Sequence, residues 1–132
     1  MNYKIIKPEQ LDNFSQYQWF GSFSNPCYGF NVKSDVSKVL AVSKNTNTSF
    51  FVNTLYLVVT ALNKIDEMRM RFVNGEIRLY DVINPTFTVM TDSGQFDNAG
   101  FAMKEDYKSF YAEAKAVLDR VSHEKEIRDS YN

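Results

Sequence analysis

The sequence contains few of the residue types that build disulfide-rich, metal-binding or flexible proteins. It has one cysteine, Cys27, and one histidine, His123, among 132 residues. A single cysteine excludes an internal disulfide, so a reducing, cytoplasmic compartment is the simplest prediction. One cysteine and one histidine are too few for the ligand set of a structural zinc site, so we predict no metal. Five glycines and three prolines form no linker, and no segment repeats.

Excess charge and long apolar runs are also absent. The 15 basic and 16 acidic residues give a net charge of -1. No basic field is available to hold a phosphate backbone, which argues against a nucleic-acid partner. The most apolar segment, residues 50–62, is shorter than the roughly 20 residues that cross a bilayer, and the first fourteen residues lack a signal-peptide core. We predict a soluble protein with no membrane partner.

Aromatic residues, in contrast, are abundant. The chain has 11 Phe, 8 Tyr and 1 Trp, and its composition is 44% hydrophobic and 23% charged, which is typical of a globular protein. Each aromatic side chain buries a large area, so either the core is aromatic or part of the surface is covered by another molecule. We predict a single domain over residues 1–132, with a polar tail at residues 123–132 because that segment has no apolar face.

The clearest local pattern is a β-hairpin. Residues 68–73 alternate apolar and basic side chains, and residues 76–80 alternate again. Asn74 and Gly75 lie between the two runs, and Asn-Gly is the dipeptide typical of a two-residue type I′ turn, since both of its positions need a positive φ.

Further elements follow from periodicity and capping residues. We predict strands at residues 28–32, 86–90 and 96–103, with a turn at 92–94. A short helix should run from a Ser34 cap to about Ser43, with Asp35 near its positive end. Thr48 or Ser49 should cap a second helix, buried on more than one side, with its main apolar stripe at positions 51, 55, 58, 62 and 65. Asp106 should cap a last helix whose stripe is Tyr107, Phe110, Tyr111, Ala114, Val117, Leu118 and Val121. The predicted class is α+β, an antiparallel sheet with helices on one face.

A series of short motifs follows the same order as these elements: Phe50-Phe51, Glu67-Met68-Arg69-Met70-Arg71, Asn74-Gly75-Glu76, Tyr80-Asp81, Asn84-Pro85, Phe87-Thr88-Val89, Phe96, and Asp106-Tyr107 with Phe110-Tyr111. In these motifs and in its order of elements, the chain resembles the N-terminal half of the chloramphenicol acetyltransferase family. The resemblance extends over about residues 11–121 and is most specific from Glu67 to Val89.

The resemblance implies an activity and an assembly. Members of the family are homotrimers that transfer an acetyl group from acetyl-CoA, their co-substrate, to a small-molecule alcohol, the acceptor. The acceptor lies in a tunnel between subunits, and the N-terminal half supplies one wall. The resemblance places that substrate-binding wall at Phe20, Gly21, Asn25, Cys27 and Met90. Gly21 stands where chloramphenicol-specific members have Tyr or Phe, which argues against chloramphenicol itself as the substrate.

The family's catalytic base is missing from these residues. The resemblance implies a histidine in a C-terminal His-His-x-x-x-Asp-Gly motif, and the 132 residues contain no such motif. A hydroxyl needs a positioned base to attack a thioester at neutral pH. We therefore expect an incomplete domain, the acceptor side of a truncated acetyltransferase, that is inactive alone and has no catalytic residue of its own.

Several residues have a functional and a structural interpretation. His123 is either a base or metal ligand, or a solvated histidine at a helix C-terminus. The second interpretation is favoured, because a positive charge is stabilised at that end of a helix. Cys27 is a nucleophile or, more simply, a small wall residue. Arg69, Arg71 and Arg78 form either a functional set or a solvated strand face paired with Glu67 or Glu76. Five aromatic residues either line a ligand pocket or pack in the core or in a subunit contact: Phe14, Tyr17, Trp19, Phe20 and Phe23.

A second functional hypothesis remains open. The many aromatics without a catalytic set also fit a non-catalytic module on half a fold, one that binds a small molecule or associates with other subunits. Such a half fold should expose a sheet edge and an apolar helix face.

Overall fold

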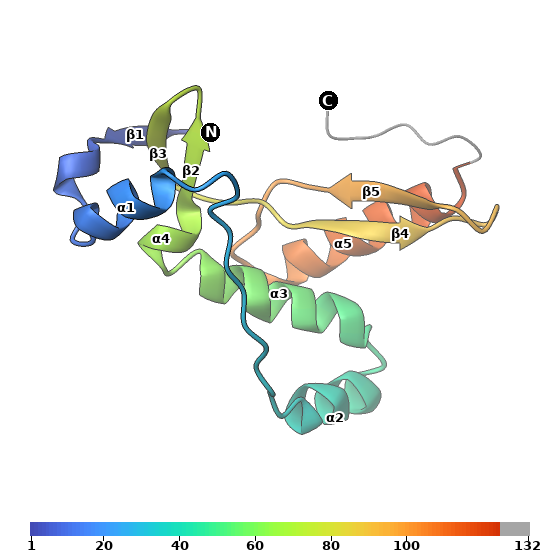
Figure 1. Ribbon diagram of the computed structural model, residues 1–132. Coiled ribbons are helices and arrows are strands. Elements are labelled where there is room, and N and C mark those ends of the chain that lie inside the picture. Colours follow the sequence, from blue (N-terminus) through green and yellow to red (C-terminus); the bar gives the residue numbers. More distant parts are fainter. Residues whose placement is uncertain (125–132) are drawn as a thin grey trace.

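The structure is a computed structural model and describes residues 1–124 (Figure 1). The predicted polar tail at 123–132 therefore lies outside the described residues beyond Glu124. In chain order the elements are β1 (Tyr3–Ile6), the 3₁₀ turn η1 (Pro8–Gln10), α1 (Phe14–Gly21), α2 (Ser37–Thr46), α3 (Phe50–Leu62), α4 (Asp66–Arg69), β2 (Met70–Val73), β3 (Glu76–Tyr80), β4 (Thr86–Met90), β5 (Phe96–Gly100) and α5 (Tyr107–Ser122).

The strands of the described chain form two antiparallel sheets. One has the order β1-β3-β2, and the other is the two-stranded ribbon β4-β5. The predicted hairpin is β2–β3, paired from Val73 with Glu76 to Met70 with Leu79. Its turn residues Asn74 and Gly75 have φ values of 51° and 82°, which confirms the predicted turn. The α+β class with antiparallel strands is confirmed.

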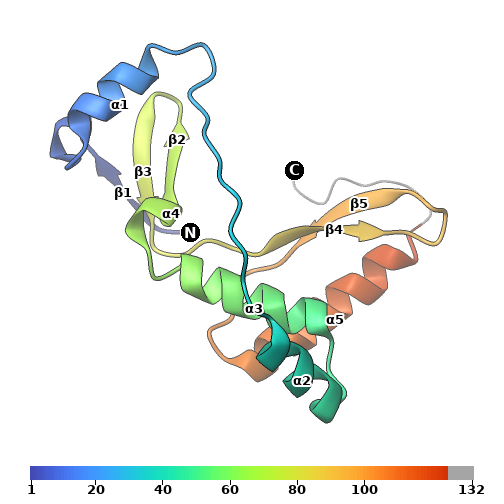
Figure 2. The same cartoon turned by 60° about the horizontal axis from the view of Figure 1, so that its bottom comes forward.

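The main core lies between the β4–β5 ribbon and α5 (Figure 2). The buried face of the ribbon includes Val89 and Ala99, and α5 contributes Phe110, which is fully buried. As predicted, Asp106 caps α5, because its carboxylate accepts a hydrogen bond from the Ser109 N–H at 2.8 Å. The predicted apolar stripe is confirmed at its centre, where the buried residues of α5 are Phe110, Ala114, Val117 and Val121.

Helix α3 turns a different side inward from the one predicted. Ser49 caps it as expected, accepting from the Val52 N–H at 3.3 Å. The residues it buries are Val52, Asn53 and Val59, whereas Phe51 and Val58 of the predicted stripe are 44% and 50% exposed. The helix is apolar around most of its circumference, so the spacing of apolar residues could not identify its inward side. Burial on more than one side is not seen among the described residues.

The buried Asn53 explains part of that orientation. Its Nδ2 donates to Ser43 Oγ and to Thr48 Oγ1, both at 2.8 Å. Its Oδ1 accepts from the Tyr107 hydroxyl at 2.5 Å. A buried amide must be hydrogen-bonded, and these three partners come from α2, the α2–α3 loop and α5. The network therefore ties α3 to the two neighbouring helices through its Asn53 side.

The predicted strand at residues 28–32 is wrong. Residues 22–36 form a connection between α1 and α2 with no helix or strand (Figure 2). Tyr28, Phe30 and Val32 alternate as predicted but are 90%, 79% and 72% exposed. A strand needs a neighbour for its backbone, and no strand within residues 1–124 pairs with this segment. We call residues 24–34 the arm.

Several boundaries differ from the prediction, and four elements, β1, η1, α1 and α4, were not predicted. Helix α2 begins at Ser37 rather than after Ser34, because the Asp35 carboxylate accepts hydrogen bonds from the N–H and the hydroxyl of Ser37. The first hairpin strand begins at Met70, since residues 66–69 form α4. Strand β5 ends at Gly100 rather than Met103. Strand β1 and helix α1 were missed, being short segments without a regular apolar alternation.

Candidate functional site

The five predicted acceptor-side residues lie on three parts of the chain. Phe20 and Gly21 end α1, Asn25 and Cys27 belong to the arm, and Met90 ends β4. All five are exposed. Helix α1 and the C-terminal end of β4 lie at opposite sides of the molecule in both views (Figures 1 and 2). The structure thus brings together Phe20 and Gly21 but does not bring Met90 to them, and their substrate-binding role stays a prediction.

An exposed aromatic cluster surrounds Phe20. The ring centroids of Trp19, Phe20 and Phe23 lie 5.0 to 5.5 Å apart, in tilted and edge-to-face geometries. The three side chains are 63%, 43% and 43% exposed. Rings at such distances attract one another, so the cluster is an ordered apolar surface. A small ring-bearing molecule could stack on it.

Gly21 leaves space beside this cluster. A β-carbon at position 21 would meet no atom within 4 Å. Packing within the described residues therefore does not demand a glycine there. The first carbon of a larger side chain at this position would displace nothing.

The outer face of the β4–β5 ribbon is the second exposed apolar surface. Met90 and Phe96 face each other across the two strands and are 67% and 63% exposed. A hollow of about 400 Å³ lies on the ribbon beside them and is lined by Thr86, Phe87, Thr88 and Asn98. Sequence reasoning did not identify this hollow, because none of its lining residues carries a charge or a distinctive motif.

His123 is held by carboxylates. It follows α5, and its Nδ1 lies 2.7 Å from Asp92 Oδ2 while its Nε2 lies 3.5 Å from Asp119 Oδ1. The hydrogen bond to Asp92, together with the charges of both carboxylates, raises the pKa of His123 above its ordinary value. Because both nitrogens face carboxylates, the protonated ring is favoured, which is unsuitable for a base. The favoured interpretation of His123 as an exposed helix-terminal histidine is confirmed; its contact with Asp92 was not foreseen.

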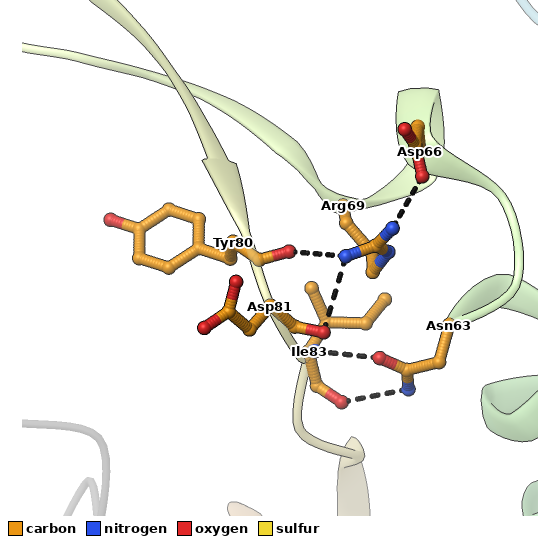
Figure 3. A network of polar contacts seen from close by, with 6 residues as sticks. All are labelled: Asn63, Asp66, Arg69, Tyr80, Asp81 and Ile83. Atoms are coloured by element: carbon orange, nitrogen blue, oxygen red, sulfur yellow. Dashed lines mark hydrogen bonds and ion pairs between the residues drawn. The ribbon is translucent and has the colours of Figure 1, made fainter. Parts of the chain in front are cut away.

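Arg69 organises the segment that follows β3 (Figure 3). Its Nη1 donates to the carbonyl oxygens of Tyr80 and Asp81 at 2.7 and 3.2 Å, and its Nη2 pairs with Asp66. The Arg69 side chain is 16% exposed, against 59% for that of Asp66. A guanidinium presents several donors in a fixed plane, so one side chain can hold two successive carbonyls.

Asn63 holds the next residues of the same segment (Figure 3). The Ile83 N–H donates to Asn63 Oδ1 at 2.8 Å, and Asn63 Nδ2 donates back to the Ile83 carbonyl at 3.0 Å. Asn84 then accepts from the Met103 N–H at 3.0 Å, and Pro85 is fully buried. This path leads directly into β4, so the Arg69 and Asn63 contacts set the direction of the ribbon relative to α3.

The other arginines are structural as well. Arg69 lies on α4, so it does not share a strand face with Arg71 as predicted. Arg71 donates to the carbonyls of Met68 and Met70 at 2.8 and 2.7 Å. Arg78 pairs with Glu76 at 3.0 Å, one of the two predicted partners, and lies 4.6 Å over the Tyr3 ring. These contacts favour the structural interpretation for all three.

Two classes of site are not found in the part of the chain that the structure describes. No group of three or more His, Cys, Asp or Glu residues within residues 1–124 is arranged to hold a metal ion. Among the same residues, no helix is long and apolar enough to span a membrane.

Comparison with known proteins decides the family. The sequence profile of chloramphenicol acetyltransferase matches residues 1–130. The chain belongs to the chloramphenicol acetyltransferase family. A solved chloramphenicol acetyltransferase structure superposes with a TM-score of 0.86 at 27% identity, covering 95% of this chain and 59% of that one. The resemblance stated from Glu67 to Val89 is thereby confirmed for the family.

Curated relatives carry the same name. The Bacillus pumilus chloramphenicol acetyltransferase is 25% identical over 96 residues, covering 72% of this chain and 44% of that protein. Chloramphenicol acetyltransferase 3 of Escherichia coli is 27% identical over 99 residues, covering 72% of this chain and 46% of that protein. The chain spans about half the length of the curated chloramphenicol acetyltransferases it matches.

Proposed function

We propose that these residues form the acceptor side of an acetyl-CoA-dependent O-acetyltransferase. The observation that carries the proposal is the match to a chloramphenicol acetyltransferase along 95% of the chain. In the reaction, the acceptor hydroxyl oxygen attacks the thioester carbonyl, its proton passes to a base, and the CoA thiol leaves. The proposal includes a cytoplasmic location and assembly into a homotrimer, as expected for the family.

The base in this proposal comes from residues other than these 132. His123 faces Asp92 and Asp119, and the His-His-x-x-x-Asp-Gly motif is not among the residues. We expect the purified 132-residue chain to release thiol from acetyl-CoA no faster than buffer when an alcohol acceptor is present. A polypeptide that carries these residues together with the motif should transfer acetyl. Transfer at an enzyme's rate by the 132 residues alone would contradict the assignment of the base.

The acceptor wall can be tested separately with Trp19, the sole tryptophan. Its ring lies 5.0 Å from Phe20, so a molecule stacked on Phe20 should change its fluorescence. We expect chloramphenicol, used as a probe, to change the emission weakly, Phe20→Ala to abolish the change, and Gly21→Tyr to strengthen binding by extending the aromatic surface. Phe72→Ala, on the exposed strand β2, is the control. An equal response in the Phe20→Ala protein would contradict the wall assignment.

A non-catalytic association or small-molecule-binding module is the second candidate. The observation that favours it is the large apolar surface left exposed on α3, the arm and the ribbon, which includes Phe51, Tyr28, Phe30 and Met90. The thiol-release assay on a polypeptide that carries these residues together with the histidine motif separates the two candidates. If that longer polypeptide binds a small molecule or associates but transfers no acetyl group, the result would favour the module.

A further inference from the structure

The β2–β3 turn places a side-chain amide next to an unhindered peptide nitrogen. In the sequence, Asn74 is the one asparagine that a glycine follows, and both turn residues are exposed. A β-carbon added at Gly75 would meet no atom within 4 Å, so the space beside the Gly75 nitrogen is open. The side-chain carbon of Asn74 and the nitrogen of Gly75 are therefore adjacent along the chain and uncovered.

Neither of these groups is engaged in a hydrogen bond. Within residues 1–124, the Asn74 amide and the Gly75 N–H have no hydrogen-bond partner. The ladder of the hairpin begins at the next pair, Val73 with Glu76. The two central residues of a two-residue hairpin turn lie outside the ladder. Neither group therefore has to be released from a partner before it can react.

Reaction between the two groups requires rotation about the Asn74 backbone, so the turn has to open locally. In the part of the chain that the structure describes, β2 is the outer strand of its sheet and pairs only with β3. Phe72 beside the turn is 68% exposed, and neither Val73 nor Glu76 is buried. In both views the turn lies at the end of the hairpin away from α3 (Figures 1 and 2). A region with few buried contacts opens at a lower free energy than the core. The turn can therefore open while the core between α5 and the ribbon stays intact.

We propose that Asn74 is a site of spontaneous covalent modification in the folded protein, through a succinimide formed with Gly75. Hydroxide removes the Gly75 N–H proton, and the nitrogen attacks the Asn74 side-chain carbon Cγ. A new bond forms between Cγ and the Gly75 nitrogen, the bond from Cγ to the amide nitrogen breaks, and ammonia leaves with a proton taken from water. A second water then opens the ring at either carbonyl and gives aspartate or isoaspartate. The inference does not depend on acetyl transfer.

The two products should affect the hairpin differently. Aspartate keeps the length of the turn, and Asp-Gly is itself favoured in type I′ turns. Isoaspartate adds one carbon to the main chain, so the two-residue turn no longer fits and the pairing of Val73 with Glu76 should be lost. Either product changes the net charge from -1 to -2, because one neutral amide becomes one carboxylate.

Peptide mapping of the purified 132-residue chain, after incubation at mildly alkaline pH, measures the conversion. Trypsin cuts after Arg71 and Arg78, so Asn74 is the single asparagine of peptide 72–78. Chromatography coupled to mass spectrometry separates the asparagine, aspartate and isoaspartate forms of this peptide. The Asn74→Asp protein supplies the standard for the aspartate form and has no amide to lose at this position.

Asn31 is the control within the same chain. It is also exposed, but Val32 follows it, and a β-branched side chain crowds the attacking nitrogen. We expect Asn74 to convert on the order of tenfold faster than Asn31, which corresponds to a barrier lower by about 1.4 kcal/mol. The Asn74 rate should also rise with pH, because hydroxide removes the proton. Conversion of Asn74 no faster than that of Asn31 would overturn the proposal.

Urea below the unfolding transition tests whether the folded protein reacts. Urea lowers the free energy of global unfolding in proportion to the surface that unfolding exposes. Opening of a two-residue turn exposes little surface, so we expect the Asn74 conversion rate to change little across this range of urea. A rate that climbs in proportion to the globally unfolded fraction would overturn the proposal, because the folded turn would then protect Asn74.

Discussion

Replacing Phe110 by alanine should test whether the core lies where the structure places it. Phe110 is fully buried between α5 and the ribbon, and its ring makes edge-to-face contacts with Tyr56 and Phe101 at 5.1 and 5.0 Å. The matched change is Phe72→Ala, because Phe72 on β2 is 68% exposed. Both substitutions remove the same ring, so the difference between them measures burial alone.

The expected magnitude follows from the buried area. A buried aromatic side chain removes about 150 to 250 Å² from water, worth about 4 to 6 kcal/mol at roughly 25 cal/mol/Å². The alanine methyl retains part of this area and the cavity adds a cost, so the loss should be about 3 to 5 kcal/mol. Since single domains have about 5 to 15 kcal/mol of stability, Phe110→Ala should remove at least about a fifth of it. Phe72→Ala should cost about 0.5 kcal/mol or less.

Urea unfolding followed by far-UV circular dichroism measures both losses. All proteins should be compared at one concentration, so that any association contributes equally to each midpoint. A lower urea midpoint, with an unchanged slope of the free energy of unfolding against urea concentration, would identify a loss of stability rather than a change in compactness. Equal losses in the two variants would refute the placement of the core on the Phe110 side of the ribbon.

Two further predictions concern polar contacts. Arg69→Met should lower the free energy of unfolding in urea by about 1 to 3 kcal/mol, since it leaves two carbonyls without a charged donor. Arg71→Met is the control and should cost less, because the hydrogen bonds of Arg71 are more exposed. Equal costs would contradict the role assigned to Arg69. The pKa of His123 is raised by Asp92, so its stabilising contribution is full below the unfolded pKa and is lost as pH rises through the folded pKa. Urea midpoints should therefore fall from mildly acidic to mildly alkaline pH, and Asp92→Asn should reduce that fall; an unchanged pH dependence would contradict the pairing.

The elements predicted correctly are those specified by local chemistry. The β2–β3 turn was predictable because Asn74 and Gly75 can both adopt the positive φ that the turn requires. Helix α5 was predictable because Asp106 caps it and one stripe of apolar residues meets one sheet. In each case the information lies within one element and does not depend on a distant partner.

The inward side of α3 was not predictable by the same means. Apolar residues surround most of that helix, so any of several stripes could have faced the core. The decision is made by Asn53, whose amide needs three partners supplied by Ser43, Thr48 and Tyr107. Those partners are up to 54 residues away in sequence. A polar residue within an apolar run was therefore the informative signal for the inward side of α3.

The candidate site was predictable in part. The motif around Arg69, Asn84 and Pro85 identified the family, and the structure explains it as the set of contacts that directs the chain into β4. The acceptor-side residues were located by resemblance alone. Within one chain they lie on separate exposed elements, and no local pattern indicates which of them would meet. Their role in an acceptor wall therefore stays a prediction.

Two of the errors share one physical cause. The arm was predicted as a strand, and α3 was predicted to be buried on more than one side. The arm has the apolar alternation of a strand, but no described residue covers its apolar side chains. The outer face of the ribbon, with Met90 and Phe96 exposed, belongs to the same class. A sequence pattern reports the environment for which a residue is suited, while the structure of one chain reports only the environment that this chain supplies. The two disagree in the same direction on α3, the arm and the ribbon, where apolar side chains suited to burial are exposed among the described residues.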